Sequence, residues 1–274
     1  MVARARECFE AVTQQVALHP AAAAEAWWRL ANLHRLHSSW DEALEAAHKS
    51  EALATAHGFT DTAADALNIQ GAVWWIRGDF PRARALFERM LSLAQTPEIR
   101  AKALQNLGGI AADDRDFDEG ERLFAESREV YRDLGDARGE AMSLLNIGRL
   151  QTDRGFVELA RATLEQAVGG ARLSGDLEMH AAALLNLGIA LSALGLHGDA
   201  EEKITTAYGQ FTIADIPVQR VRCLMQLATV AADRGELGAA RLCLTHARSV
   251  AESSGLPREL ALIETQIAGL PAFP

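Results

Sequence analysis

The chain has 274 residues, of which 49% are hydrophobic and 23% charged, and its formal net charge is −10. This composition is that of a folded protein, and its negative charge disfavours nucleic acid or an anionic membrane surface as a partner. The three cysteines lack metal-site spacing and are too few for a disulfide framework, which favours a cytoplasmic protein. The chain does not open on an apolar signal-peptide core, and its longest uncharged run, residues 181–196, is short for a membrane span.

The first predicted element is a helix within residues 1–20. Its apolar residues Ala5, Phe9 and Val12 keep a spacing that recurs over residues 83–90. Because residues 83–90 fall in the second helix of a repeated unit, we expect residues 1–20 to form an N-terminal half-repeat.

Residues 21–256 contain six copies of one pattern. A column of small residues recurs at spacings of 40, 37, 40, 40 and 40: Ala31, Gly71, Gly108, Gly148, Gly188 and Ala228. Sixteen residues after each comes a mostly large apolar column: Ala47, Phe87, Phe124, Leu164, Ile204 and Leu244. Each copy has helical periodicity, a break with turn residues, and helical periodicity again, which predicts a helical hairpin. Small residues allow the two helices of a hairpin to approach closely.

The last predicted element is a helix within residues 257–274. Leu260, Ile263, Ile267 and Leu270 form one apolar stripe, while Glu264 lies off it. We expect this helix to cap the exposed face of the last hairpin.

The repeat pattern resembles the tetratricopeptide repeat family over residues 21–256, most plainly in NLGGIAADDRDFDEGERLF at residues 106–124. The 40-residue repeat is similar to those of kinesin light chains and of the C-terminal arms of bacterial ATPase-type transcription regulators. The resemblance implies an all-α fold, a right-handed superhelical solenoid of about six hairpins in a single domain, 1–274. It also implies that the first helices line a concave groove that binds another protein. One departure is Gln70, where the other copies have Leu or Ile.

Two tryptophan pairs lie in the predicted first helices. Neighbouring residues on a helix point about 100° apart, so Trp27 and Trp74 are expected to pack and Trp28 and Trp75 to face the groove. Leu36, Ile69 and Ile76 share the groove columns, which predicts an aromatic and aliphatic patch of the kind that marks binding sites. The alternative is that the N-terminal half-repeat covers this patch.

A polar column follows along the groove. It runs Arg29, Ile69, Asn106, Asn146, Asn186 and Gln226, and the groove prediction also includes Asn32, Asn68 and Arg149. A row of asparagine amides can pair with the backbone of an extended peptide, or each amide can satisfy a neighbouring helix end. Asp113, Asp153 and Asp233 share a further column, which favours a partner with a few basic residues.

No catalytic or cofactor motif accompanies these features. His34 and His37 lie three residues apart but without further ligands in a metal-site pattern, so no metal is expected. Phosphate-binding glycine loops and nucleophile elbows are absent from the sequence. The sequence therefore predicts a non-catalytic module, without a cofactor, that binds an extended peptide or helix of a partner protein. Two alternatives remain open: a ligand- or peptide-sensing regulatory arm, and a self-associating scaffold.

Overall fold

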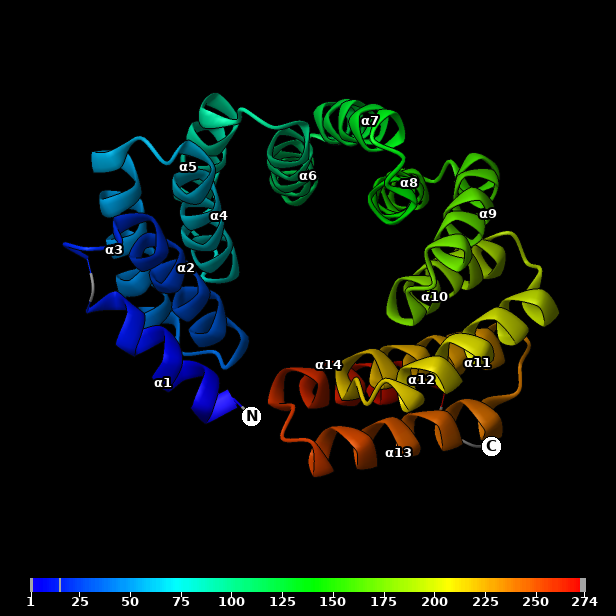
Figure 1. Cartoon of the computed structure of the whole chain (residues 1–274). Coiled ribbons are helices and arrows are strands. Elements are labelled where there is room, and N and C mark those ends of the chain that lie inside the picture. The colour runs from blue at the N-terminus through cyan, green and yellow to red at the C-terminus, as the bar shows by residue number, and fades with distance from the viewer. Residues whose placement is uncertain (1, 15, 272–274) are drawn as a thin grey trace. The chain divides into compact units, whose positions relative to one another are not determined.

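The computed structural model describes residues 2–14 and 16–271, and every structural statement below concerns these residues. The described chain is all-helical (Figure 1). A single helix, α1 (Val2–Thr13), precedes six hairpins: α2 (Pro20–Leu36) with α3 (Trp40–His57), α4 (Thr60–Ile76) with α5 (Phe80–Leu93), α6 (Pro97–Asp113) with α7 (Phe117–Asp133), α8 (Ala137–Asp153) with α9 (Val157–Ser174), α10 (Leu177–Ala193) with α11 (His197–Ile213), and α12 (Pro217–Asp233) with α13 (Leu237–Ser253). The last helix is α14 (Pro257–Gly269). The predicted fold of six helical hairpins flanked by single helices is confirmed.

The chain divides into two compact units. Unit 1 is Met1–Gly135, with α1 to α7, and unit 2 is Asp136–Pro274, with α8 to α14. The expected domain limits include residues 1, 15 and 272–274, and the predicted packing includes the side chain of Ala5; these lie outside the described residues. That residues 1–274 form one solenoid domain stays a prediction.

Each unit has two layers of helices. In unit 1, α2 contacts α4 and α4 contacts α6, whereas the described parts of α3, α5 and α7 make no contacts with one another. In unit 2, α8, α10, α12 and α14 form the same kind of series. Helices on the inner side of a curved stack lie closer together than those on the outer side. The first helices of the hairpins therefore form the concave layer of each unit.

The two predicted columns meet at the crossing of each hairpin. A Cβ atom added to Gly71 would lie 2.5 Å from Cε1 of Phe87, and one added to Gly148 would lie 2.5 Å from Cγ of Leu164. Both of these large side chains are fully buried. The large side chains of the second helices thus leave room only for small residues at these positions of the first helices, as the sequence predicted.

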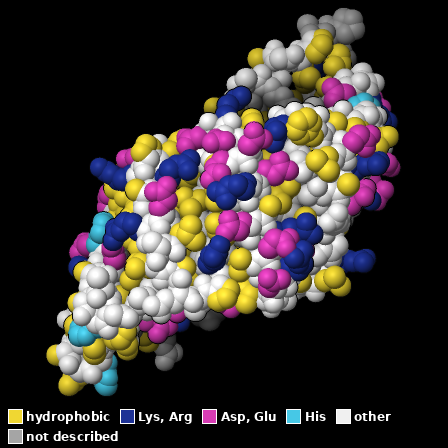
Figure 2. Space-filling model, turned by 90° about the horizontal axis from the view of Figure 1, so that it is seen from above, with side chains coloured by type: hydrophobic (Ala, Val, Ile, Leu, Met, Phe, Trp, Pro, Cys, Tyr) yellow, Lys and Arg dark blue, Asp and Glu magenta, His cyan; other side chains and the backbone are white. Residues whose placement is uncertain are grey.

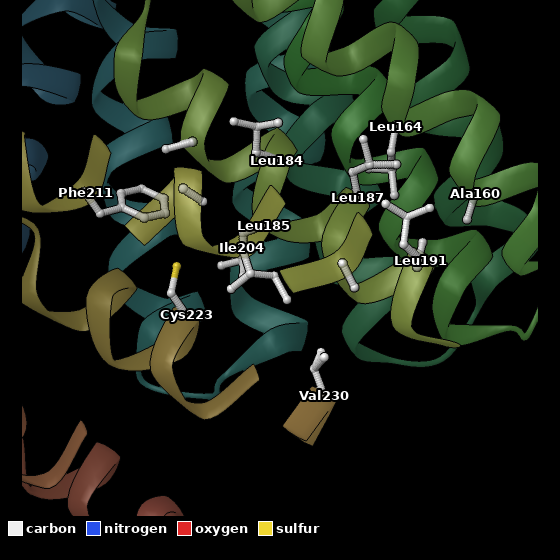
Figure 3. Packing of buried hydrophobic residues seen from close by; sticks show 14 residues of the cluster. Ala160, Leu164, Leu184, Leu185, Leu187, Leu191, Ile204, Phe211, Cys223 and Val230 are labelled. Atoms are coloured by element: carbon white, nitrogen blue, oxygen red, sulfur yellow. The ribbon is translucent and has the colours of Figure 1, made fainter. Parts of the chain in front are cut away.

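In unit 2 the large column belongs to a core that spans α9 to α12 (Figure 3). Ile204 and Phe211 of α11 point into it together with Cys223 of α12, and all three are fully buried. Burial raises the pKa of the Cys223 thiol to about 12. This thiol is therefore unreactive at neutral pH, as expected of a cysteine in an apolar stretch.

The turns between helices also follow the sequence. The predicted breaks at Ser38, Gly78, Gly155, Gly195 and Gly235 all have positive φ values, between 58° and 80°. Asp215 takes the same conformation, with φ of 52°, between the fifth and sixth hairpins. No described helix is long and apolar enough to cross a membrane.

One helix is shorter than its counterparts. The second helix α5 has 14 residues, whereas α3 has 18 and α7 has 17, and this accounts for the single 37-residue spacing. Residues 94–96 run from α5 to Pro97, the first residue of α6. A surface cavity of about 520 Å³ lies between this segment, the first turn of α6 and the last turn of α7.

Candidate protein-binding surface on the first helices

We call the solvent-accessible side of α2, α4 and α6 in unit 1, and of α8, α10, α12 and α14 in unit 2, the first-helix surface. The ten predicted site residues all lie in these helices and all keep solvent-accessible area: Arg29 is exposed, and Trp28, Asn32, Asn68, Trp75, Asn106, Asn146, Arg149, Asn186 and Gln226 are half-buried. Ile69, which was expected in the apolar patch, is buried. Ile69 therefore belongs to the core and not to the solvent-accessible patch.

Trp28 lies at the start of this surface, beside α1. It packs with Phe9 of α1 and with Trp27 on a cluster that includes Ile69. The guanidinium of Arg29 lies 5.3 Å from the centre of the Trp28 ring and pairs with Glu25 at 2.6 Å. The N-terminal helix thus packs near Trp28, and the indole still remains half-exposed.

Trp75 reaches from α4 to α6. Its indole Nε1 donates a hydrogen bond to Oδ2 of Asp113 at 2.6 Å, and its ring meets Phe87 edge-on at 6.2 Å. A Cβ on Gly109 would lie only 2.1 Å from Cη2 of Trp75, so the indole fills the space that Gly109 leaves. Trp74 packs against the same core cluster as Trp75 and, together with Trp40 of α3, against a second cluster that includes Val73. Both tryptophans of this pair therefore pack, and Trp75 also remains half-exposed.

Sequence reasoning missed the packing role of Trp75, although a signal for it exists. Gly109 is the only glycine in its column, which otherwise holds Asn32, Ala72, Arg149, Ile189 and Thr229. A glycine within a helix is unfavourable and often marks a close approach. Beside Trp75, Ile76 is 57% exposed and Leu36, 40 residues earlier, is 64% exposed.

The asparagines are partly engaged with the protein itself. Asn106 donates from Nδ2 to Oδ1 of Asn68 at 2.6 Å, and Asn186 donates from Nδ2 to the carbonyl of Ala182 at 2.8 Å. Oδ1 of Asn32 accepts from Arg35 at 2.9 Å. Asn106 lies in unit 1 and Asn186 in unit 2. The three-asparagine row therefore stays a prediction, and in unit 1 the neighbour of Asn106 is Asn68.

Charged groups on the α4 and α6 part of the surface are also paired within the protein. Nζ of Lys102 lies 4.0 Å from Oδ1 of Asp65. Burial raises the pKa of the Asp65 carboxyl, and Lys102 lowers it in part. On the face of the molecule seen in Figure 2, Lys and Arg side chains are interspersed with Asp and Glu.

At the other end of the chain, Gln226 lines a cavity of about 380 Å³, which we call the α12–α14 cavity. Its lining consists of Val221, Arg222, Met225 and Gln226 of α12, and Arg258, Glu259 and Leu262 of α14. Sequence reasoning assigned Gln226 to the groove but missed the residues of α14, because it treated that helix only as a cap. The spacing of 40 residues from Pro217 to Pro257 could have revealed them.

The described residues contain no group of three His, Cys, Asp or Glu side chains that could hold a metal ion. A ring nitrogen of His37 lies 2.8 Å from the carbonyl of Leu33. Burial lowers the pKa of His34, and the charge of Arg6 lowers it further.

Comparison with known proteins identifies the class of the fold. Residues 99–172, from α6 to α9, match the family model of the tetratricopeptide repeat. This stretch is therefore similar to tetratricopeptide repeats, the family that the sequence resembles. No curated protein matches the sequence significantly.

Solved structures extend the likeness of fold to most of the chain. A Rap protein complexed with competence and sporulation factor has a TM-score of 0.68 and 14% identity, over 96% of this chain and 79% of that one. BtubC (BKLC) from P. vanneervenii has a TM-score of 0.62 and 15% identity, over 88% and 94%. The APC/C hetero-tetramer Cut9–Hcn1 has a TM-score of 0.71 and 15% identity, over 93% and 46%. At these identities the likeness concerns the fold alone.

Proposed function

We propose that this chain is a non-catalytic interaction module that binds an extended peptide or a helix of a partner protein on its first-helix surface. The observation that carries the proposal is the exposure of Leu36 and Ile76, at 64% and 57%, at the corresponding last positions of α2 and α4 in the concave layer of unit 1. Ile76 directly follows the half-exposed Trp75 in α4. Large apolar side chains exposed together on a concave layer mark an interaction site.

In each unit, an amide group on the concave layer supports binding of a main chain. Oδ1 of Asn106 and Oδ1 of Asn186 accept no hydrogen bond from the described residues. Each can therefore accept a backbone N–H of a bound segment, which would add affinity without demanding a particular sequence. Two proteins of similar fold are named in complexes, the Rap protein with its factor and Cut9 with Hcn1.

A regulatory arm is the second candidate, because the Rap structure of similar fold holds a bound factor. In a repeat stack each hairpin contacts only its neighbours, so a bound ligand can change the curvature by small added rotations. Small-angle scattering with and without the captured partner distinguishes the two: a changed radius of gyration of this chain supports the regulatory arm. We also propose a cytoplasmic location, consistent with the three free cysteines.

The test is a lysate pull-down read by mass spectrometry, with a matched pair of variants. Leu36→Ser/Ile76→Ser removes the exposed apolar pair of the first helices. Leu173→Ser/Ile213→Ser removes a pair that has the same 40-residue spacing but lies on the second helices α9 and α11, at 81% and 77% exposure. Every bait must show the same helicity as the wild type.

We expect one partner to be captured by the wild type and by the Leu173/Ile213 variant, and lost with the Leu36/Ile76 variant. Asn106→Ala/Asn186→Ala should weaken the same capture. If the Leu36/Ile76 variant keeps every partner of the wild type, the first-helix surface of unit 1 is not the binding site. A mass of one chain at high concentration removes self-association.

A further inference from the structure

The α12–α14 cavity combines charge and apolar surface in one place. The side chain of Leu262 is 52% exposed and that of Met225 half-buried, so they offer an apolar wall. Arg222 and Arg258 are exposed and contribute two guanidinium groups, and Glu259 contributes one carboxylate. The cavity thus has a local net charge of +1, opposite in sign to the −10 of the whole chain.

Hydrogen bonds hold the two helices that form this cavity. Nε2 of Gln266 in α14 donates to the carbonyl of Met225 at 3.1 Å and to Oγ1 of Thr229 at 3.0 Å. Gln266 follows Gln226 by 40 residues, so α14 takes the register of a first helix. The cavity is therefore a continuation of the first-helix surface, and the hydrogen bonds of Gln266 hold its two helices together.

The arginines of the cavity differ from others in unit 2. Arg234 pairs with Glu201 at 2.8 Å, and Arg248 pairs with Glu264 at 2.7 Å. Arg222 donates only to the amide oxygen of Gln219, at 3.2 Å. Over residues 2–14 and 16–271, neither Arg222 nor Arg258 forms an ion pair with a carboxylate. Both guanidinium groups are free to bind an anion.

We propose that the α12–α14 cavity binds a carboxylate of the partner protein, with an apolar side chain of the partner against Met225 and Leu262. This inference rests on the proposed function and names the chemistry of one part of the partner. The guanidinium groups of Arg222 and Arg258 donate charge-assisted hydrogen bonds to the carboxylate. The amide of Gln226 lines the same cavity and donates a further hydrogen bond. The negative charge of Glu259 repels the bound carboxylate and lowers the affinity of the cavity for it.

The column of Asp113, Asp153 and Asp233 predicts basic residues in the partner. Arg222 and Arg258 indicate that the part of the partner bound at the α12–α14 cavity is acidic. The carboxylate can come from a side chain or from a chain terminus. Three capped peptides distinguish these sources: acetyl-Ala-Ala-Leu with a free terminal carboxylate, acetyl-Ala-Glu-Leu-amide, and acetyl-Ala-Gln-Leu-amide as the uncharged control. The full chain carries methyl-labelled methionine, and the Met225 methyl signal, assigned by its loss in Met225→Leu, reports binding.

We expect the Met225 signal to shift with at least one carboxylate peptide and to stay unchanged with the uncharged control. Arg222→Gln/Arg258→Gln should weaken this binding about tenfold or more, since charge-assisted hydrogen bonds are lost. Glu259→Gln should strengthen it about two- to fivefold, since a like charge is removed. Arg161→Gln/Lys203→Gln removes the same charge from second helices of unit 2 and should change nothing. The Met90 signal, from the core of unit 1, should stay constant in every variant.

Equal shifts with all three peptides, or no shift with any, would overturn the carboxylate site. Unchanged affinity in the Arg222/Arg258 variant, or weaker binding by Glu259→Gln, would also overturn it. These outcomes are separable from the lysate test. If the Leu36/Ile76 pair is needed for capture but the peptide experiment fails, the proposed function stands without this site. If the peptides bind as expected but no variant of the first-helix surface alters capture, the proposed function fails.

Discussion

The α4–α6 part of unit 1 and the α12–α14 part of unit 2 use corresponding positions of the fold in different ways. In unit 1, side chains of α4 bind side chains of α6: Trp75 to Asp113, Asn68 to Asn106, and Asp65 to Lys102. In unit 2, Gln266 of α14 binds the backbone and Thr229 of α12. Among the described residues, no carboxylate pairs with Arg222 or Arg258. The same surface can thus join neighbouring hairpins or keep its charges available for a ligand.

The largest expected effect tests whether the two units unfold separately. Phe87→Ala in unit 1 and Phe211→Ala in unit 2 each remove a fully buried ring, and each should lower the free energy of unfolding of its own unit by about 3–5 kcal/mol. All five tryptophans lie in unit 1, and Cys223 contacts the same cluster as Phe211. Phe87→Ala should lower the urea midpoint of tryptophan fluorescence, and Phe211→Ala should speed thiol labelling of Cys223. If either variant changes both signals equally, the units unfold as one.

A smaller effect tests the Trp75 contact. Gly109→Ala places a Cβ 2.1 Å from the indole of Trp75 and should cost about 1–3 kcal/mol of stability in unit 1. Gly169→Ala, in α9, meets no atom within 4 Å and should stabilise unit 2 by about 0.5–1 kcal/mol, because alanine favours the helix. Urea unfolding followed by circular dichroism measures both. Similar effects of the two substitutions would mean that Trp75 does not fill this space tightly.

The smallest effect concerns the half-buried carboxyl of Asp65. Because burial raises the pKa of Asp65, the folded state binds this proton more tightly than the unfolded state. Stability should therefore fall as the pH rises from the unfolded pKa through the raised folded one. Asp65→Asn should flatten this part of the pH profile and raise stability at pH 7 by about 0.5 kcal/mol or less. A thermal unfolding series between acidic and neutral pH measures it, with Asp199→Asn, at an exposed position of α11, as the control. An unchanged slope in Asp65→Asn contradicts the assignment to Asp65.

Features that repeat along the chain could be predicted from the sequence, because each hairpin repeats the same contact. The pairing of Gly71 with Phe87 is one case, since both belong to columns that recur in register. Departures from a column could not be explained in this way. Gln70 is buried in a column of Leu and Ile, and its Nε2 donates at 2.7 Å to Glu51, which also pairs with Arg89. This network joins α3, α4 and α5 through contacts found in one copy only.

For the candidate site, the sequence predicted on which helices the ten residues lie but not which contacts they make. The register placed all ten proposed residues on first helices, but it could not reveal that Asn106 binds Asn68 or that Trp75 lies over Gly109. Such contacts depend on how far one helix lies from the next, and spacing along the chain does not contain that distance. The lining of the α12–α14 cavity by Arg258 became apparent only with α14 in place.

The short helix α5 has a consequence for how this chain tolerates change. It ends about one turn early, and the next hairpin nevertheless starts at Pro97 with the same column of small residues at Gly108. The stretch from the start of α5 to the start of α6 is thus three residues shorter than its counterparts, and the hairpins on either side keep their columns of small residues. The segment of residues 94–96 is consequently a natural insertion point, where a fluorescent tag or a helical extension can be grafted while both neighbouring repeats keep their contacts.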